Sequence, residues 1–227
     1  YSLYREGVAD RDVDAARLIG ALPHPVDIVH TGSLALVPED VHRVRDCLGH
    51  ARDRGAFVSV DLNLRPRAVT DPKAYVQAVE SVLPLCDLIK CSDEDLQAMG
   101  RLGSPVAQAR LMHKHSGAAI VTVTGGENGA TLLHAIDEVG QLAIRPRSVV
   151  DTIGAGDCFQ AGLLIALGDQ NLLSRGALKT TNTDALTRVL HHAQLTASLN
   201  VERPGCNPPT RAEIVQRAET LARTEGS

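Results

Sequence analysis

Short apolar runs alternate with longer amphipathic segments along this chain, and this alternation restricts the fold more than any other feature of the sequence. The runs expected to form strands are 26–30, 57–61, 88–90, 119–124, 130–133 and 141–144. Strands that alternate with helices are typical of βαβ units, in which helices cover both faces of a parallel sheet. The pattern therefore predicts the α/β class with a largely parallel central sheet.

Capping residues, glycine and proline mark the expected helix boundaries. An amphipathic helix is predicted over 38–54, with Gly55 as its stop. Asp71-Pro72 favours a helix start, Ser92 caps a further helix, and Thr210-x-x-Glu213 is a capping box. Further helices are expected over 104–115, 154–167 and 186–200. The stretch 168–183 has the weakest pattern and is predicted to be an irregular or mobile connection.

Size and cysteine content favour one domain without cross-links. With 227 residues and 44% hydrophobic content, the chain can bury one sizeable core without disulfides or metals. We therefore expect a single domain over residues 1–227. The five cysteines are an odd number and include no Cys-x-x-Cys pair, so they indicate neither a disulfide framework nor a zinc site.

The charge balance and the lack of long apolar runs exclude two classes of partner. The chain has 23 Lys and Arg against 27 Asp and Glu, and no basic block that could follow a phosphate backbone. We expect no nucleic-acid partner. No apolar run approaches membrane-spanning length, and the first residues resemble no signal peptide. We expect no membrane partner and a cytoplasmic location.

Several common catalytic motifs are missing from the sequence. It contains neither Gly-x-x-x-x-Gly-Lys-Ser/Thr nor Gly-x-Gly-x-x-Gly, which disfavours P-loop enzymes and dinucleotide dehydrogenases. Gly32-Ser33 is not part of a hydrolase Gly-x-Ser-x-Gly elbow. His113-x-His115 and His191-His192 lack a metal-binding context, so we interpret them as surface or packing residues.

The segment Asp151-Thr-Ile-Gly-Ala-Gly-Asp157 is the strongest chemical signal. It runs directly into an apolar helix, so its glycines are expected to let backbone amides converge at a helix N-terminus, where they can hold an anion. Asp157, in the first helical turn, could accept a proton from a hydroxyl that attacks a phosphate. The alternative interpretation is a tight strand-to-helix turn followed by an acid that favours the helix dipole.

The same segment matches, residue by residue, the Asp-Thr-x-Gly-Ala-Gly-Asp signature of the ribokinase-like (PfkB) carbohydrate kinases. Other segments resemble this family in the same order along the chain: 4–10, 30–33, 61–66, 90–96, 123–129 and 203–213. The chain is most similar to the fructokinase branch. The resemblance implies a three-layer α/β/α ribokinase-like fold. Because the chain begins at Tyr1 without Met, we expect an N-terminal truncation, with the lid and first strands mostly missing and residues 1–10 as the end of the lid.

The resemblance also implies roles for individual residues. Asp157 would be the catalytic base, and the amides of Gly154, Ala155 and Gly156 would form the anion hole. Expected ATP-binding residues are Lys90, Ser92, Thr124, Gly126, Gly129, Asn200 and Gly205. Expected sugar-binding residues are Arg5, Asn63, Arg65 and Asp157. Asp95 is expected near magnesium, through a water molecule, and Asp151 is a candidate for a monovalent cation such as potassium.

By the same resemblance, the protein is expected to transfer the γ-phosphate of ATP to a sugar hydroxyl with Mg²⁺, and fructose is the first expectation. The alternatives are ribose and 2-keto-3-deoxygluconate, whose carboxylate Arg5 and Arg65 could bind. Leu3 stands where relatives that use the acid tend to have Tyr, which favours a neutral sugar. A catalytically inactive sugar- or nucleotide-binding regulator is the alternative from another class. A homodimer is a further expectation for the full-length protein.

Overall fold

The computed structural model describes residues 7–135 and 138–225, which fall into two compact units. Unit 1 contains residues 7–123 and 133–135, and unit 2 contains residues 124–132 and 138–225. The single domain expected from the sequence stays a prediction. Residues 1–6, part of the expected lid end and including the expected sugar contact Arg5, lie outside the described residues.

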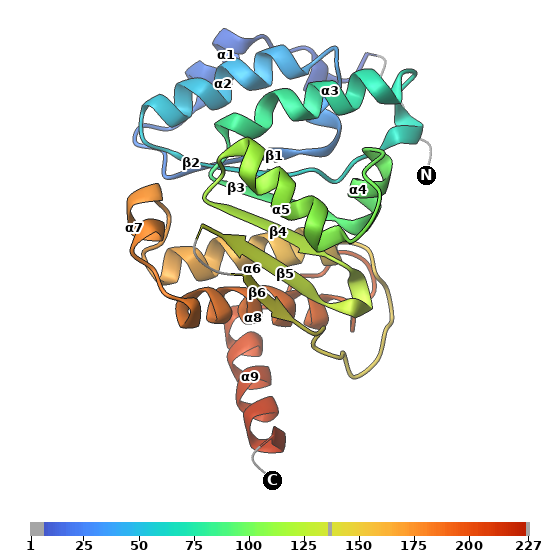
Figure 1. Ribbon diagram of the computed structural model, residues 1–227, viewed down its shortest axis with the longest axis vertical. Helices are drawn as coiled ribbons and strands as arrows, with labels where there is room; N and C mark the ends of the chain where they lie inside the picture. Colours follow the sequence, from blue (N-terminus) through green and yellow to red (C-terminus); the bar gives the residue numbers. More distant parts are fainter. Residues whose placement is uncertain (1–6, 136–137, 226–227) are drawn as a thin grey trace. The chain divides into compact units, whose positions relative to one another are not determined.

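The described strands form one sheet in the order β1-β2-β3-β4-β5-β6 (Figure 1). Their bounds are β1 Ile28–Gly32, β2 Phe57–Asp61, β3 Leu88–Ser92, β4 Ile120–Thr124, β5 Ala130–His134 and β6 Glu138–Gln141. β1 pairs with β2, and β2 with β3, in parallel, with Gly32 opposite Asp61 and Asp61 opposite Lys90. The division between the units runs through β4 and β5. The predicted α/β class is confirmed.

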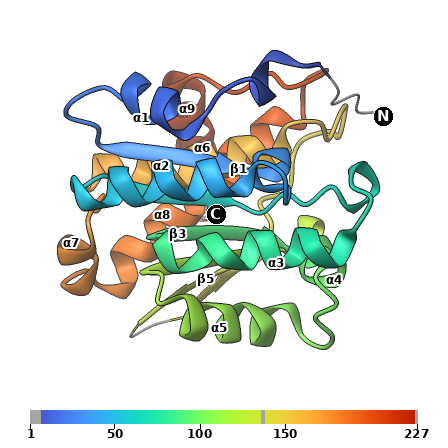
Figure 2. The same ribbon diagram turned by 90° about the horizontal axis from the view of Figure 1, so that it is seen from above.

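Unit 1 places amphipathic helices against its parallel strands. The helices are α1 Ala15–Ala21, α2 Val41–Asp53, α3 Pro72–Val82, α4 Asp93–Ala98 and α5 Pro105–Ser116, with 3₁₀ turns at 9–11, 33–36, 66–68 and 83–85. α2, α3 and α5 lie in a row (Figure 2). Leu48 of α2, Val60 of β2 and Tyr75 of α3 are at most 1% exposed and belong to one core, so the apolar faces predicted from the sequence do form the interior.

Unit 2 is built mainly from helices. They are α6 Ala155–Asp169, α7 Arg175–Lys179, α8 Thr183–Asn200 and α9 Arg211–Glu225, and a 3₁₀ turn at Gly126–Asn128 follows β4. α6 packs closely against α8 because Gly162 has no side chain; a Cβ there would lie 2.8 Å from Cα of Ala193. Leu195, Leu199 and Ile214 join α8 to the beginning of α9, and α9 extends away from α8 (Figure 1).

Capping confirms several predicted boundaries. The carboxylate of Asp71 accepts hydrogen bonds from Lys73 N and Ala74 N at the start of α3. Ser92 and Asp95 form a capping box at α4. At α9, Thr210 N donates to Glu213 Oε2 at 2.7 Å and Glu213 N donates to Thr210 Oγ1 at 3.4 Å.

Other boundaries differ from the prediction. The structure places β1 at Ile28–Gly32 and β6 at Glu138–Gln141, whereas 26–30 and 141–144 were expected. Helix α1 has no counterpart in the prediction. The stretch 168–183 is not wholly irregular, because Arg175–Lys179 is helical and Ser174 Oγ caps it by accepting from Ala177 N.

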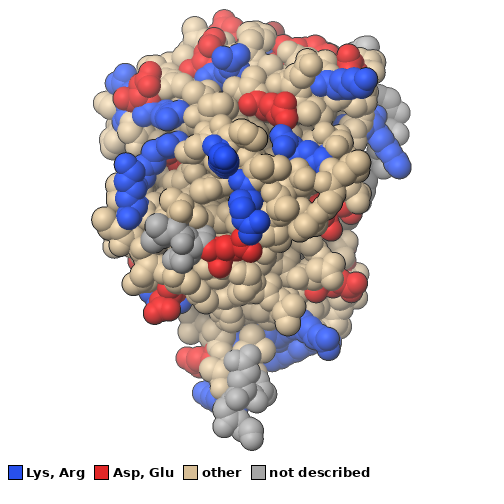
Figure 3. Space-filling view, viewed as in Figure 1, with Lys and Arg blue, Asp and Glu red and all other residues tan. Residues whose placement is uncertain are grey.

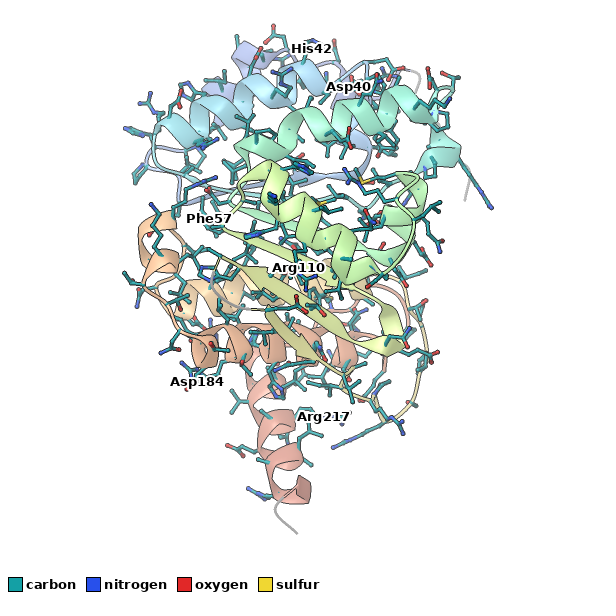
Figure 4. All side chains as sticks on the ribbon, viewed as in Figure 1. Asp40, His42, Phe57, Arg110, Asp184 and Arg217 are labelled. Carbon is teal, nitrogen blue, oxygen red and sulfur yellow. The ribbon has the colours of Figure 1, made fainter. Side chains whose placement is uncertain are left out.

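Charged side chains hold residues 11–13 of unit 1 against α2. Asp40, at the start of α2 (Figure 4), pairs with Arg11 at 3.2 Å and with Arg43 at 3.0 Å. Arg43 also donates to the carbonyl of Val13 at 2.7 Å. Lys and Arg are interspersed with Asp and Glu on the face that Figure 3 shows, which agrees with the lack of a basic block in the sequence. None of the described helices combines the length and apolar character that crossing a membrane requires.

Gly32 is expected to be intolerant of any side chain. A Cβ on Gly32 would overlap the carbonyl oxygen of Asp61 on the neighbouring strand and lie 2.9 Å from its carbonyl carbon. We expect Gly32→Ala to reduce the free energy of unfolding by about 3 kcal/mol, because the backbones of β1 and β2 would have to separate. Gly49→Ala, in open space within α2, should instead be neutral or stabilising by up to about 1 kcal/mol. Urea denaturation of the two variants checks this difference, and equal stabilities would contradict it.

Candidate active site

The turn that precedes α6 requires glycine at position 154. Gly154 is the N-cap of α6 and has a left-handed φ of +77°, a conformation that glycine adopts without strain. A Cβ at this position would overlap Sγ of Cys206 and lie 2.8 Å from Cβ of Cys206. Both the backbone angle and the packing therefore require glycine here. Because glycine has no side chain to cap the helix, the first amides of α6 have no side-chain cap.

These amides differ in how they are bonded. Ala155 N donates to the carbonyl of Thr152 at 3.2 Å. Of the three amides expected to form the anion hole, it is therefore the one that already has an acceptor. In the part of the chain that the structure describes, the N–H groups of Gly154, Gly156 and Asp157 have no acceptor. Unpaired donors at a helix N-terminus, where the helix dipole is positive, form an anion-binding site. We call the amides of residues 154–157 the cradle.

Asp157 lies beside the cradle with its carboxylate available. The residue is exposed and occupies the first turn of α6. Among the described residues its carboxylate makes no hydrogen bond and no ion pair. This differs from the usual fate of acids in first turns, which often fold back onto backbone amides. The side chain is therefore free to meet a polar ligand held at the cradle.

Asp151 fixes the turn instead of projecting from it. Its Oδ1 accepts from Ile153 N at 2.9 Å, and its Oδ2 accepts from Gly205 N at 2.9 Å. These two backbone bonds, in that order, hold the pKa of the Asp151 carboxyl below its ordinary value. The ionised carboxylate thus ties the loop before α6 to a segment more than fifty residues later. The monovalent-cation role expected for Asp151 stays a prediction.

Asn200 makes a second connection between the same two segments. It is fully buried at the end of α8, where Nδ2 donates to the carbonyl of Ile153 at 2.9 Å and Oδ1 accepts from Asn207 N at 3.0 Å. The side-chain amide therefore holds the loop before α6 and the segment after α8 together. Its predicted contact with ATP stays a prediction.

The two glycines predicted near ATP play different structural roles. Gly126 is exposed with φ +55°, and a Cβ there would meet nothing within 4 Å, so its backbone is open to a ligand. Gly129 is buried with φ +89°, and a Cβ there would overlap the carbonyl oxygen of Gln141 and lie 2.8 Å from Ala143 N. Packing therefore accounts for Gly129. Thr124 is half-buried at the end of β4.

Unit 1 contains the other predicted residues. Lys90 is 4% exposed, and its Nζ donates to Oδ2 of Asp61 at 2.9 Å across the paired ends of β2 and β3. The sequence suggested an ATP contact for Lys90, but it did not reveal this buried ion pair. The sequence signal that could have revealed this ion pair is an acid and a base at the ends of neighbouring predicted strands.

Asp95 also has both carboxylate oxygens engaged. It is 5% exposed; Oδ1 accepts from Leu64 N at 2.7 Å, and Oδ2 accepts from Ser92 N at 2.8 Å. Asp95 therefore holds the loop after β2 against the start of α4. The described residues contain no group of three or more His, Cys, Asp or Glu side chains placed to hold a metal ion. A magnesium contact through water at Asp95 stays a prediction.

The loop that Asp95 holds contains two predicted sugar contacts. Asn63 is half-buried and has a φ of +39°. Arg65 is exposed, and its Nη1 donates to the carbonyls of Asn63 at 3.1 Å and Leu64 at 3.0 Å. These bonds leave other guanidinium donors for a ligand. The structure thus brings Asn63, Arg65, Ser92 and Asp95 together within unit 1.

Comparison with known proteins identifies the family. The family model described as pfkB family carbohydrate kinase matches residues 4–213. This chain belongs to the pfkB family of carbohydrate kinases. The expectation drawn from the segment 151–157 and its companions is therefore confirmed.

Relatives of this pfkB chain include curated fructokinases. A fructokinase of Rhizobium leguminosarum bv. trifolii is 31% identical over 186 residues, which is 82% of this chain and 56% of the relative. A fructokinase of Klebsiella pneumoniae is 29% identical over 186 residues, which is 75% of this chain and 60% of the relative. The chain thus spans little more than half the length of these curated relatives.

Solved structures confirm the ribokinase-like α/β fold of this pfkB chain. A fructokinase with bound ATP from Xylella fastidiosa superposes with a TM-score of 0.83 at 23% identity, covering 97% of this chain and 70% of the other. A fructokinase double mutant from Vibrio cholerae O395, with fructose, ADP and potassium bound, gives 0.75 at 22% identity, covering 92% and 65%. At such identities the likeness establishes the fold alone.

Asp151 leads to a testable expectation about the turn. Asp151→Asn keeps one acceptor oxygen but loses the charge and one of the two backbone bonds, so we expect a lower Tm at neutral pH. Because the folded pKa is depressed, this contribution is present above the ordinary carboxyl pKa of 3.8 and is lost as the pH falls through the folded value. The Tm difference between the variant and the wild type should therefore shrink toward acid pH. A difference that grows in acid would contradict this role.

Proposed function

We propose that this protein is an ATP-dependent sugar kinase that transfers the γ-phosphate of ATP to a hydroxyl of fructose. The observation that carries the proposal is the start of α6, where unpaired amides form a cradle and the exposed carboxylate of Asp157 makes no other contact. The similarity to proteins named as fructokinases in two bacteria supports fructose as the acceptor. The cytoplasmic location and the homodimer expected from the sequence stay predictions.

Chemically, the carboxylate of Asp157 takes the proton of the attacking hydroxyl. As that proton moves, the alcohol oxygen bonds to the γ-phosphorus, and the bond to the bridging oxygen of ADP breaks. The N–H groups of Gly154 and Gly156 donate to the phosphoryl oxygens as their charge redistributes. Gly126 and Gly205 would let the backbone approach the rest of the nucleotide, and Asn63 and Arg65 would bind sugar hydroxyls. The products are a sugar phosphate and ADP.

The residues of the site suit the phosphates of ATP better than they suit a metal ion. The cradle suits the phosphates of ATP, because the N–H groups of Gly154, Gly156 and Asp157 are unpaired among the described residues and no side chain caps them. Magnesium, which would neutralise the phosphate charge, usually binds through phosphates and one or two carboxylates, and Asp95 already accepts two backbone bonds. Asp151 is likewise engaged twice, so neither acid forms a ready-made site for Mg²⁺ or K⁺. We assign no step to either ion.

A substrate comparison tests the proposal. The purified chain is given ATP and Mg²⁺ with fructose, ribose or 2-keto-3-deoxygluconate, and kcat/KM is measured from ADP release, with the sugar phosphate identified by ³¹P NMR. We expect the highest kcat/KM with fructose. A preference for the keto acid would overturn the choice of sugar and point to Arg65 as a carboxylate partner. Binding of ATP and fructose by calorimetry without any turnover would instead support the inactive regulator.

A further inference from the structure

Two thiols lie beside the cradle. Cys158 lies one helical turn after Gly154 in α6, and Cys206, in the segment after α8, is near enough to raise the pKa of the Cys158 thiol. Cys206 also packs against Gly154, since a Cβ on Gly154 would overlap its sulfur atom. Cys158 is 3% exposed, whereas Cys206 is exposed. One accessible thiol and one buried thiol therefore lie close to each other beside the first turn of α6.

The remaining cysteines are placed differently. Cys47, Cys86 and Cys91 are buried and belong to unit 1. All five cysteines are free. Of these five, only Cys206 is exposed, and its thiol partner belongs to the same unit. This combination of an accessible attacking thiol and an adjacent resolving thiol is what disulfide exchange requires.

We propose that Cys158 and Cys206 are a thiol–disulfide modification site that controls access of phosphate to the cradle. The oxidant is a small disulfide of the glutathione class. The Cys206 thiolate attacks this disulfide, forming a mixed disulfide and releasing one glutathione thiol. The Cys158 thiolate then attacks Sγ of Cys206 and displaces the second glutathione thiol. Two protein thiols are oxidised to one disulfide, and one oxidised glutathione is reduced to two thiols.

The environment of Cys158 slows the closing step. Burial, followed by the neighbouring Cys206 thiol, raises the pKa of the Cys158 thiol to about 11. Only a small part of Cys158 is therefore thiolate at neutral pH, which limits the rate at which the protein disulfide closes. The rate of closure should increase with pH up to that pKa, because the thiolate is the nucleophile.

Formation of the disulfide moves the segment that packs against the cradle. A disulfide sets the two sulfur atoms about 2 Å apart, which is closer than two free thiols approach, so the segment around Cys206 must move toward α6. The amide of the preceding residue, Gly205, is bonded to Asp151 at 2.9 Å. Movement of Cys206 is therefore transmitted to the loop that positions Gly154. The expected effect of the disulfide on nucleotide binding rests on the proposed function, whereas the chemistry of the two thiols does not.

Thiol counting after oxidation tests the modification itself. The full chain is incubated with oxidised glutathione, acid-quenched, denatured and alkylated, and peptides are identified by mass spectrometry. We expect the number of free thiols to fall from five to three, with one peptide pair joined through Cys158 and Cys206 and full reversal by dithiothreitol. Retention of five thiols, a stable mixed disulfide at Cys206 alone, or a cross-link between other cysteines would overturn the proposal.

The effect on the cradle is measured separately by calorimetric titration with ATP. We expect the oxidised chain to bind ATP about tenfold more weakly than the reduced chain, because small displacements degrade an aligned site. Cys206→Ser should abolish both the cross-link and the response to oxidant, whereas Cys47→Ser, in α2, should retain both. A cross-linked chain that binds ATP as tightly as the reduced chain would overturn the control of the cradle. Failure of the reduced chain to bind ATP would count against the proposed kinase function and not against the disulfide.

Discussion

Replacing Asp157 with Asn is expected to lower kcat for sugar phosphorylation by about 10²- to 10⁴-fold, the contribution typical of a positioned general base. The substitution keeps the size of the side chain but removes its ability to accept the hydroxyl proton. Because Asp157 is exposed and its carboxylate makes no hydrogen bond among the described residues, no structural contact is lost. The Tm and the affinity for ATP should remain close to those of the wild type.

Asp184→Asn is the matched control for this experiment. Asp184 is also an exposed acid in the first turn of a helix, α8, where Asn182 caps the helix by accepting from Ala185 N (Figure 4). Like Asp157, Asp184 lies near the positive end of a helix dipole, but it has no glycine cradle beside it. We expect an unchanged kcat for Asp184→Asn. Equal activity of the Asp157→Asn and wild-type proteins would show that Asp157 is only a helix-dipole residue.

Gly154→Ala should damage both stability and nucleotide binding. The left-handed φ of +77° and the overlap with Cys206 together should cost about 2–5 kcal/mol of unfolding free energy, from backbone strain and overpacking combined. Relief of either strain would displace the amides of residues 154–157. We therefore expect the affinity for ATP to fall as well, measured by calorimetry beside urea denaturation.

Two further variants separate backbone strain from overpacking. Gly117, the C-cap of α5, has a similar φ of +66° but open space around its Cβ position, so Gly117→Ala should cost only about 1–2 kcal/mol. Adding Cys206→Gly to Gly154→Ala removes the overlapping atoms and should recover part of the lost stability. A Gly154→Ala protein no less stable than Gly117→Ala would contradict the packing account.

The sequence predicted best the elements whose pattern is local and pronounced. β2 was expected over 57–61 and lies at Phe57–Asp61, because every residue of this strand is buried. The start of α3 was predicted from Asp71-Pro72, and the structure has the expected side-chain cap there. These signals depend on burial and capping within a few residues, which the sequence displays directly.

Elements without an apolar pattern could not be predicted in this way. Helix α1 contains no buried residue, so no apolar stripe marks it, and the neighbouring segment is held by Arg43 through the carbonyl of Val13. β1 and β6, at the two ends of the sheet order, are only partly buried. Their limited burial explains why their predicted bounds were displaced by two or three residues.

For the candidate site, the sequence indicated candidate residues but not the hydrogen bonds that connect them. The cradle and the exposed acid at Asp157 follow from a glycine pattern before an apolar helix. The bonds of Asp151 to Gly205 and of Asn200 to Ile153 join segments 54 and 47 residues apart, and no local pattern specifies them. The engagement of Asp95 by Leu64 N, 31 residues away, is of the same kind.

The most direct test of the central claim is to observe the amides of the cradle while a phosphate ligand is added. In ¹H–¹⁵N NMR spectra of the reduced full chain, titration with ATP should shift the resonances of Gly154, Gly156 and Asp157 downfield and saturably, as their N–H groups gain an acceptor. The amide of Gly117, a glycine with similar backbone angles at the end of a helix, should not move. Cradle resonances that stay fixed while ATP binds elsewhere would contradict the account.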